Sequence, residues 1–501
     1  MTTSLTSPLE GEVAVAPSRQ RVGGEGESEA LVRPSLPIRA ASTTSLPLTP
    51  HPPEPKSAPA TSPSRGEVKA IAFALLFASL LAAPSVAEDW PKWRGPRGDG
   101  TFRAPELPDT WPATGLKTVW KQPVGGGYAG VTVADGRVYT LDLIDRVAKS
   151  KDGEPDGTER VLCFDAATGK PLWAHKYPVR YGNLGGYANG PRTSPTVHDG
   201  KVYALGAVGH LFCFDAKTGA IVWQHDTVAK FGARIPEWGF AGSPVVDGDN
   251  LLVHIGGTGG ACLLAFDRNT GKEVWRSLTD PAGYCTPAVI RPKSGKQVVI
   301  WTPENVHGVE AATGKPLWKV PYKVTYGVSI APPVFHDGIV FVTGYWEGAK
   351  AIRLGDKPTD ADVIWTDTKT LRGLMAQPLY RDKHVYSIDR GFGLTGFELA
   401  TGKKLWDDEN QLTPAGRNPH ASIVWLNNSD RILALNATGE LVLAKLSPQG
   451  YEEQSRVKAL NGRVWGHPAF AGRFMFAKTD GAEAWQKAGP HELVCVELVE
   501  K

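Results

Sequence analysis

The sequence is poor in the features that mark several common protein classes. Only 3 of its 501 residues are methionine and 5 are cysteine, and no two cysteines are adjacent or in a CxxC pair. Zinc-ribbon, thioredoxin-like and haem-attachment motifs are therefore excluded. The formal net charge is only +3, and lysine and arginine are spread along the chain, which argues against nucleic acid as a partner. There is also no GxSxG nucleophile elbow and no phosphate-binding P-loop.

The cysteines are best explained as residues of the packed interior. They are Cys163, Cys213, Cys262, Cys285 and Cys495. An odd number leaves at least one free thiol in an exported protein, and we interpret most of them as small buried apolar residues. One disulfide stays an open alternative, because spacing alone does not decide pairing.

Long hydrophobic runs are missing as well. The longest, Ala70–Ala83, follows Lys69 and precedes small residues that end at Ala87. It is shorter than the roughly 20 residues that cross a bilayer, so residues 68–87 are predicted to be a secretory signal peptide cleaved after Ala87, with an uncleaved membrane anchor as the alternative. The mature chain, without a transmembrane span, is then periplasmic or secreted.

Residues 1–67 are rich in Pro, Ser, Thr, Gly and Glu and have no apolar periodicity. Such a segment buries too little apolar surface to offset the entropy of ordering, so we expect disorder. A signal peptide normally starts at the initiator. Our hypothesis is that translation begins near Val68 and that residues 1–67 are a mis-annotated extension.

What the sequence has in abundance is glycine, 56 residues, and tryptophan, 16 residues. A phrase of the form Asp-Ala-x-Thr-Gly-x-x-x-Trp returns about every fifty residues, a period typical of repeat architectures. Its copies end at Trp173, Trp223, Trp275, Trp318 and Trp406.

Each copy has the pattern of a β-hairpin, with an acidic residue that can bond turn amides and a glycine that can take positive φ. A second hairpin signal, Asp-Gly, stands upstream of the copies at Asp135, Asp199, Asp247 and Asp337. Two hairpins per unit make four antiparallel strands, which is one blade of a β-propeller. The predicted fold class is therefore all-β.

A weaker unit closes at Trp365, and another opens at Asp430. The last unit, which ends near Leu498, lacks its tryptophan strand, and Lys117–Lys121 offers that strand before the first complete unit. Pairing the two ends would close the ring and remove free sheet edges. We therefore expect an eight-bladed β-propeller over residues 117–501, preceded by a lead-in segment at 88–116, with seven blades as the alternative.

The repeat resembles the pyrroloquinoline-quinone (PQQ) repeat of quinoprotein alcohol dehydrogenases and of the outer-membrane-protein assembly lipoprotein of Gram-negative bacteria. The segments Asp89–Pro96 and Glu237–Pro244 are similar to exported PQQ-like proteins of planctomycetes. The resemblance implies that the repeated tryptophans dock between neighbouring blades. The residues concerned are Trp120, Trp173, Trp223, Trp275, Trp318, Trp365 and Trp406.

The first strand of each propeller blade lines the central channel, so the residues that enter these strands surround one mouth. These residues are Tyr128, Arg192, Trp238, Tyr284, Tyr326, Gln377, His420 and His467. All but Tyr128 and Gln377 are our cofactor-binding candidates. An aromatic and cationic funnel suits a flat or anionic ligand. The alternative is that these side chains simply fill a narrow channel.

A PQQ dehydrogenase needs an aromatic floor, a calcium ion held by carboxylate and amide oxygens, an arginine near the quinone and a carboxylate base. The resemblance offers Trp238, Arg192, Glu237 and Asn418 for these roles. The adjacent cysteines of many quinoprotein alcohol dehydrogenases are missing. The sequence therefore establishes no cofactor, although PQQ with calcium is a possibility. None of the 12 histidines has zinc-site spacing, and His198 and His336 adjoin turns, so no metal site is predicted.

Two functions remain. The first is a non-enzymatic exported binding or scaffold protein, with a small ligand or protein partner at the channel mouth. The second is a PQQ-dependent oxidoreductase acting on an alcohol or sugar. Catalytic residues are not assigned, because a fold hosts many functions and the activity has to be argued from the site.

Overall fold

The computed structural model describes residues 88–147, 154–182, 184, 190–480 and 491–499. All of them belong to one of two compact units, Leu80–Lys501. The predictions made for residues 1–67 and for the signal peptide lie outside the described residues.

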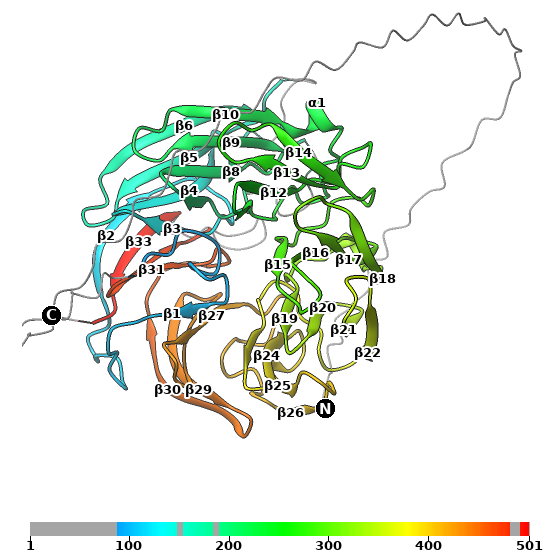
Figure 1. Ribbon diagram of the computed structural model, residues 1–501. Coiled ribbons are helices and arrows are strands. Elements are labelled where there is room, and N and C mark those ends of the chain that lie inside the picture. Colours follow the sequence, from blue (N-terminus) through cyan, green and yellow to red (C-terminus); the bar gives the residue numbers. More distant parts are fainter. Residues whose placement is uncertain (1–87, 148–153, 183, 185–189, 481–490, 500–501) are drawn as a thin grey trace, which may run out of the picture. The chain divides into compact units, whose positions relative to one another are not determined.

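The described chain forms eight four-stranded antiparallel sheets, here called blades 1 to 8, arranged in a ring as Figure 1 shows. The all-β class and the eight-bladed propeller are confirmed. Blades 1 to 4 contain the strands β3 (Thr132–Ala134), β4 (Arg137–Ile144), β5 (Gly157–Asp165), β6 (Pro171–Val179); β7 (Thr196–His198), β8 (Lys201–Leu205), β9 (His210–Asp215), β10 (Ile221–Asp226); β11 (Val245–Asp247), β12 (Asn250–His254), β13 (Leu263–Asp267), β14 (Glu273–Ser277); β15 (Ala288–Ile290), β16 (Gln297–Trp301), β17 (Asn305–Glu310) and β18 (Pro316–Pro321).

The second half of the chain continues the pattern. Blades 5 to 8 contain the strands β19 (Val334–His336), β20 (Ile339–Gly344), β21 (Gly348–Leu354), β22 (Ala361–Asp367); β23 (Leu379–Arg381), β24 (His384–Asp389), β25 (Gly393–Glu398), β26 (Lys404–Asp407); β27 (Ala421–Leu426), β28 (Arg431–Asn436), β29 (Glu440–Ser447), β30 (Gly450–Lys458); β31 (Ala469–Ala471), β32 (Phe474–Lys478), β33 (Glu492–Glu497) and β2 (Lys117–Pro123). A further strand, β1 (Thr101–Phe102), adds to blade 7, and the helices in the described part are α1 (Thr227–Phe231) and the 3₁₀ turn η1 (Thr325–Gly327).

The ring closes where the two ends of the described chain meet. Strand β2 pairs antiparallel with β33, and Trp120 lies opposite Cys495. The N-terminal strand therefore completes the C-terminal blade, as the repeat count predicted.

The repeated phrase folds as a tight turn between the third and fourth strands. In blade 1, the Asp165 carboxylate accepts hydrogen bonds from the backbone N–H of Thr168 at 2.9 Å and from its hydroxyl at 2.7 Å. Gly169 follows with φ of +72°. Each phrase thus fixes its own hairpin, because the carboxylate satisfies turn donors and the glycine tolerates the left-handed backbone.

The tryptophan at the end of a repeated phrase contacts the next blade. The Trp173 indole N–H donates to the Ala216 carbonyl at 3.1 Å, and Trp223 does the same to Arg268 at 3.1 Å. A Cβ on Gly219 would lie 2.7 Å from the Trp173 ring. The indole therefore sits directly on the turn of the following blade, which confirms the predicted docking between blades.

The seam between blades 4 and 5 departs from this pattern, because blade 5 lacks the Thr-Gly turn. The Trp318 indole N–H donates to the Gln297 side-chain oxygen at 2.8 Å within its own blade. The Gln297 amide then donates to the Pro358 carbonyl of blade 5 at 3.3 Å. Gln297 thus connects Trp318 to blade 5 through two hydrogen bonds, in place of a direct bond from the indole to a Thr-Gly turn.

The interiors of the blades are apolar and closely packed. All five cysteines are buried free thiols, as the sequence indicated, and none forms the disulfide that had been left open. Burial raises the pKa of each thiol to about 12 or above, so these groups stay neutral and pack as small apolar residues.

Candidate functional site

The segments that enter the first strands form one mouth of the channel and are tied to one another. The Ser194 backbone N–H donates to the Ser243 hydroxyl at 2.9 Å, and the Ser243 N–H donates to the Thr286 hydroxyl at 3.0 Å. On the other side, the Val131 N–H donates to the His467 carbonyl at 2.9 Å. These bonds hold the entering segments of neighbouring blades in fixed positions, so the side chains between them are well placed.

These segments enclose a cavity of about 420 Å³. Every blade contributes to its lining. The lining includes all six predicted binding residues together with three others named in advance: Arg192, Trp238, Tyr284, Tyr326, His420, His467, Tyr128, Glu237 and Asn418. The remaining candidate, Gln377, is buried and lies outside the lining.

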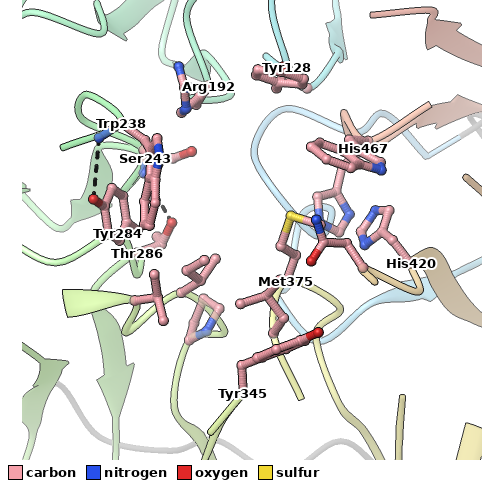
Figure 2. Close-up of a pocket in the computed structure, with 18 of the residues that line it drawn as sticks. Tyr128, Arg192, Trp238, Ser243, Tyr284, Thr286, Tyr345, Met375, His420 and His467 are labelled. Atoms are coloured by element: carbon pink, nitrogen blue, oxygen red, sulfur yellow. Dashed lines mark hydrogen bonds between the residues drawn. The ribbon is translucent and has the colours of Figure 1, made fainter. Parts of the chain in front are cut away.

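One wall of the cavity is aromatic. Trp238 and Tyr284 lie side by side with ring centroids 5.7 Å apart, and the Tyr284 hydroxyl accepts a hydrogen bond of 3.4 Å from the Trp238 backbone N–H. Figure 2 shows this pair on one side of a central space, facing His420 and His467 on the other. The separation leaves room for a flat molecule between the two walls.

The cationic part of the wall is Arg192. Its guanidinium lies 5.0 Å from the Tyr128 ring centroid and donates to the Gly190 carbonyl at 2.7 Å. Behind it, the fully buried Glu159 accepts a hydrogen bond of 2.5 Å from the Tyr181 hydroxyl. Burial raises the pKa of Glu159, although its hydrogen bonds and Arg192 act against this shift. The arginine therefore stands in a shielded, largely aromatic setting where an anion would interact strongly with it.

The opposite wall carries two histidines at right angles, with ring centroids 6.0 Å apart. The His467 Nδ1 contacts the Ser422 hydroxyl at 3.1 Å. Burial lowers the pKa of His420 to about 4, and the Trp465 backbone offsets only part of this shift. Burial, together with His420 and Arg94, lowers the pKa of His467 further. Both rings are therefore neutral at physiological pH.

The outer rim is also aromatic. Tyr326 in η1 is 65% exposed, Trp346 is 40% exposed, and the two rings meet edge to face at 5.4 Å. Tyr326 has φ of +54°, an unfavourable backbone conformation for an aromatic residue. Large exposed rings beside a cavity are typical of a binding surface, and strained residues often mark ligand clamps.

The segment Asp89–Phe102, here called the floor segment, runs beside the first strands of several blades. Trp90 exchanges backbone hydrogen bonds of 3.0 and 2.9 Å with Val133 in β3. The Val197 N–H in β7 donates to the Pro91 carbonyl at 2.7 Å. These contacts lie at or near the ends of the first strands that are remote from the mouth.

The floor segment then continues to blades 7 and 8, which lie beside blade 1 in the ring. Its strand β1 pairs in parallel with β27, with Thr101 opposite Trp425, and Figure 1 shows the two strands together. The Phe102 ring stacks on Phe470 of blade 8 at 4.6 Å. The segment thus contacts four neighbouring blades, 7, 8, 1 and 2, and its Trp93 side chain lines the cavity. The lead-in segment therefore supplies part of the cavity floor through Trp93.

The lining does not suit a calcium-bound quinone. Calcium takes six to eight oxygen ligands, several of them carboxylates. Among the described residues of the lining, the only carboxylate is Glu237, which is exposed. Throughout the described ranges, no group of three or more His, Cys, Asp or Glu side chains is placed to hold a metal ion. The described lining therefore lacks the carboxylate ligands that would hold calcium beside PQQ.

Several lining residues were missed by the sequence interpretation. Trp93 lies in the lead-in segment, which was given no role, and Tyr345 and Trp346 follow a second strand instead of preceding a first one. Arg417 and Trp465 stand two to three residues before the predicted histidines. Asp89–Pro96 stands out in the sequence, but nothing in the repeat predicts that its Trp93 side chain reaches the cavity.

Solved structures show the same fold. Europium-containing methanol dehydrogenase has a TM-score of 0.58 at 12% identity, with 82% of this chain and 98% of that chain covered. Quinohemoprotein alcohol dehydrogenase from Comamonas testosteroni has a TM-score of 0.56 at 13% identity, with 82% and 81% covered. BamB from Moraxella catarrhalis has a TM-score of 0.49 at 16% identity, with 76% and 97% covered. The first two likenesses establish the propeller fold and leave the activity open.

No sequence among the curated proteins matches this chain. The family model described as outer membrane protein assembly factor BamB matches three overlapping stretches, residues 111–277, 157–345 and 302–465. Together they span 111–465, which is well over half of the chain and most of the propeller. The repeat, the eight blades and this match agree, and the chain belongs to the BamB family of PQQ-like β-propellers.

Proposed function

We propose that this chain is an exported, non-enzymatic binding protein that holds a small ligand in the aromatic cavity at the channel mouth. The observation that carries the proposal is the convergence of side chains from all eight blades and the floor segment on one cavity of about 420 Å³. Cavities of this size with many apolar and a few polar groups are typical of small-molecule sites.

The side chains of the lining favour a ligand-binding role over a dehydrogenase activity. Besides four tyrosines, its ionisable side chains in the described part of the cavity are two arginines, two neutral histidines and one exposed carboxylate. A dehydrogenase of the quinoprotein type needs a base next to a cofactor held by a metal ion. The described residues of the lining include no second carboxylate to complete that arrangement.

Export rests on the predicted signal peptide at residues 68–87. Within the part of the chain that the structure describes, neither helix has the length or apolarity that a bilayer crossing requires. The family's description as an assembly factor adds a protein partner on the face of the ring as a second form of the same binding role.

The test uses the full chain, purified and incubated with micromolar PQQ and calcium. We expect neither cofactor absorbance nor dye-linked oxidation across a panel of alcohols and sugars. In parallel, protein purified from its own source is denatured and the released small molecules are identified by mass spectrometry. A compound retained by the wild type and lost from the Arg192→Ala/Trp238→Ala variant supports the proposal. Turnover with PQQ that is lost in Glu237→Gln would replace it with the dehydrogenase.

A further inference from the structure

His420 is a buried polar group of the cavity wall, and the Trp465 backbone lies close enough to raise its pKa, which leaves at least one ring nitrogen for a ligand. It is 2% exposed, and neither of its ring nitrogens makes a hydrogen bond of normal geometry within the described ranges. Buried polar groups are normally hydrogen-bonded, so a buried imidazole without a well-formed hydrogen bond calls for an explanation. Because His420 lines the cavity and faces its central space in Figure 2, a bound ligand is the natural partner.

The protonation state of His420 defines what it offers a ligand. Burial lowers its pKa to about 4, so the ring is neutral near pH 7. A neutral imidazole has one N–H donor and one acceptor nitrogen. It can therefore bind the edge of a ligand that carries a carbonyl, carboxylate or amide, and it does not repel a cation by charge.

The walls and floor define the ligand's shape. Trp238 and Tyr284 form a tilted aromatic pair across the cavity from His420, and the Trp93 indole lies edge to face with His467 at 5.3 Å. A flat aromatic ring gains most from such surroundings, because offset-stacked and edge-to-face contacts add to the burial of its apolar surface. A bulky aliphatic ligand would gain only the burial.

The charged side chains of the lining determine which ligand charge the cavity can accommodate. The described lining carries the guanidinium groups of Arg192 and Arg417 and the carboxylate of Glu237, which sum to one positive charge. Arg417 and Glu237 are exposed at the rim, whereas Arg192 lies deeper beside Tyr128. A single negative charge is therefore accommodated, three negative charges without a metal ion are not balanced, and a cation is disfavoured.

We infer that the cavity takes a flat aromatic compound, neutral or with one negative charge, that stands on Trp93 between Trp238 and His420 with its polar edge hydrogen-bonded to His420. This inference rests on the proposed function and names the ligand class for the same cavity.

The test compares three probes that share one ring and differ in charge: 2-naphthoate, 2-naphthamide and 2-naphthyltrimethylammonium. Binding to the full chain is measured by titration calorimetry at pH 7. We expect 2-naphthoate and 2-naphthamide to bind, and the cation to bind at least tenfold more weakly. The His420→Phe variant keeps the ring and removes both nitrogens, so both binders should weaken about tenfold or more, whereas His420→Asn, which keeps a donor and an acceptor, should recover part of the loss.

The matched control is His336→Phe. His336 is an imidazole outside the cavity lining, stacked on Tyr380 at 3.7 Å, so its replacement should leave the affinities unchanged. Trp238→Leu, at a partly exposed position of the opposite wall, provides a second loss of affinity if His420→Phe does not fold. Tighter binding of the cation than of 2-naphthoate, or equal affinities in wild type and His420→Phe, would overturn the inference.

The two proposals fail in different ways. If none of the three probes binds but a compound of another class is released from the native protein, the ligand class is wrong and the binding function stands. If the protein turns over alcohols or sugars with PQQ and calcium, the binding function itself is wrong.

Discussion

The Trp120 indole N–H donates to the Ala166 carbonyl at 2.9 Å, which joins the N-terminal strand of blade 8 to the turn of blade 1. A Cβ on Gly169 would lie 2.6 Å from the same ring, so the indole covers this turn as closely as Trp173 and Trp223 cover theirs. The seam between the two ends of the described chain is thus built like the seams between consecutive blades.

Replacing Trp120 by alanine should destabilise the propeller. The side chain is 8% exposed, and removing a buried tryptophan typically costs about 3 to 5 kcal/mol. We expect a lower free energy of unfolding in urea, followed by circular dichroism. Trp346→Ala is the control, because that ring is 40% exposed and should change the free energy by less than about 1 kcal/mol. Equal effects of the two substitutions would mean that Trp120 does not hold the seam.

Two glycines of blade 2 separate backbone strain from packing at a seam. Gly200 and Gly219 have φ of +66° and +73°, but a Cβ on Gly200 would meet nothing within 4 Å, whereas one on Gly219 would lie 2.7 Å from the Trp173 ring. Gly200→Ala should therefore cost about 1 kcal/mol for strain. Gly219→Ala should cost a further 1 to 3 kcal/mol or so, because the ring has to move. Urea unfolding of both variants measures the difference, and equal losses would contradict the docking of Trp173 on this turn.

The fold could be predicted from the sequence because each blade is specified by short local motifs. The Asp165 carboxylate that bonds to Thr168 and the glycine that follows are read directly from the phrase, and five repetitions fix the period. Even the closure was predictable, since the last unit lacked a tryptophan strand that Trp120 supplied. The contact that Trp318 makes through Gln297 could not be predicted, because it depends on the absence of a Thr-Gly turn in the neighbouring blade 5.

The cavity was predictable only where it follows the repeat. His420 and His467 enter first strands and were found by position, whereas Trp346 lies between second and third strands and was not. The floor segment was missed for a different reason. It follows no repeat, and its course depends on long-range pairing of β1 with β27, more than 300 residues away in the sequence.

A buried ion pair near the blade 8 to blade 1 seam should be sensitive to the loss of one partner. Asp142 is fully buried, accepts a hydrogen bond of 2.8 Å from the Arg160 Nε and also accepts from the Gly125 N–H. Nearby, the buried Lys478 ammonium of blade 8 donates to the Leu141 carbonyl of blade 1 at 2.9 Å. Asp142→Asn leaves these cations without their carboxylate, so we expect a loss of about 3 to 5 kcal/mol in the free energy of unfolding.

The control for this prediction is the exposed pair of Glu273 and Arg276, whose nitrogen and oxygen atoms lie 2.6 Å apart. Glu273→Gln should cost less than about 1 kcal/mol, because solvent screens an exposed pair. The double variant Asp142→Asn/Arg160→Met should be less destabilised than Asp142→Asn alone, since it removes one of the uncompensated charges. A double variant as unstable as the sum of its single changes would contradict this account.

The neutral histidine of the cavity makes stability depend on pH. Burial lowers the pKa of His420 to about 4 in the folded protein, whereas an unfolded histidine titrates near 6.5. Between these values the unfolded state binds a proton that the folded state does not, so acid favours unfolding: stability is complete above about pH 6.5 and is lost as the pH falls towards 4. Each such histidine contributes a slope of about 1.4 kcal/mol per pH unit. His420→Phe should therefore flatten the dependence by about that amount, measured by urea unfolding at pH 7.0, 6.0 and 5.0. Trp346→Ala keeps every histidine and should retain the wild-type slope, and an unchanged slope in His420→Phe would show that this imidazole is protonated in the folded cavity.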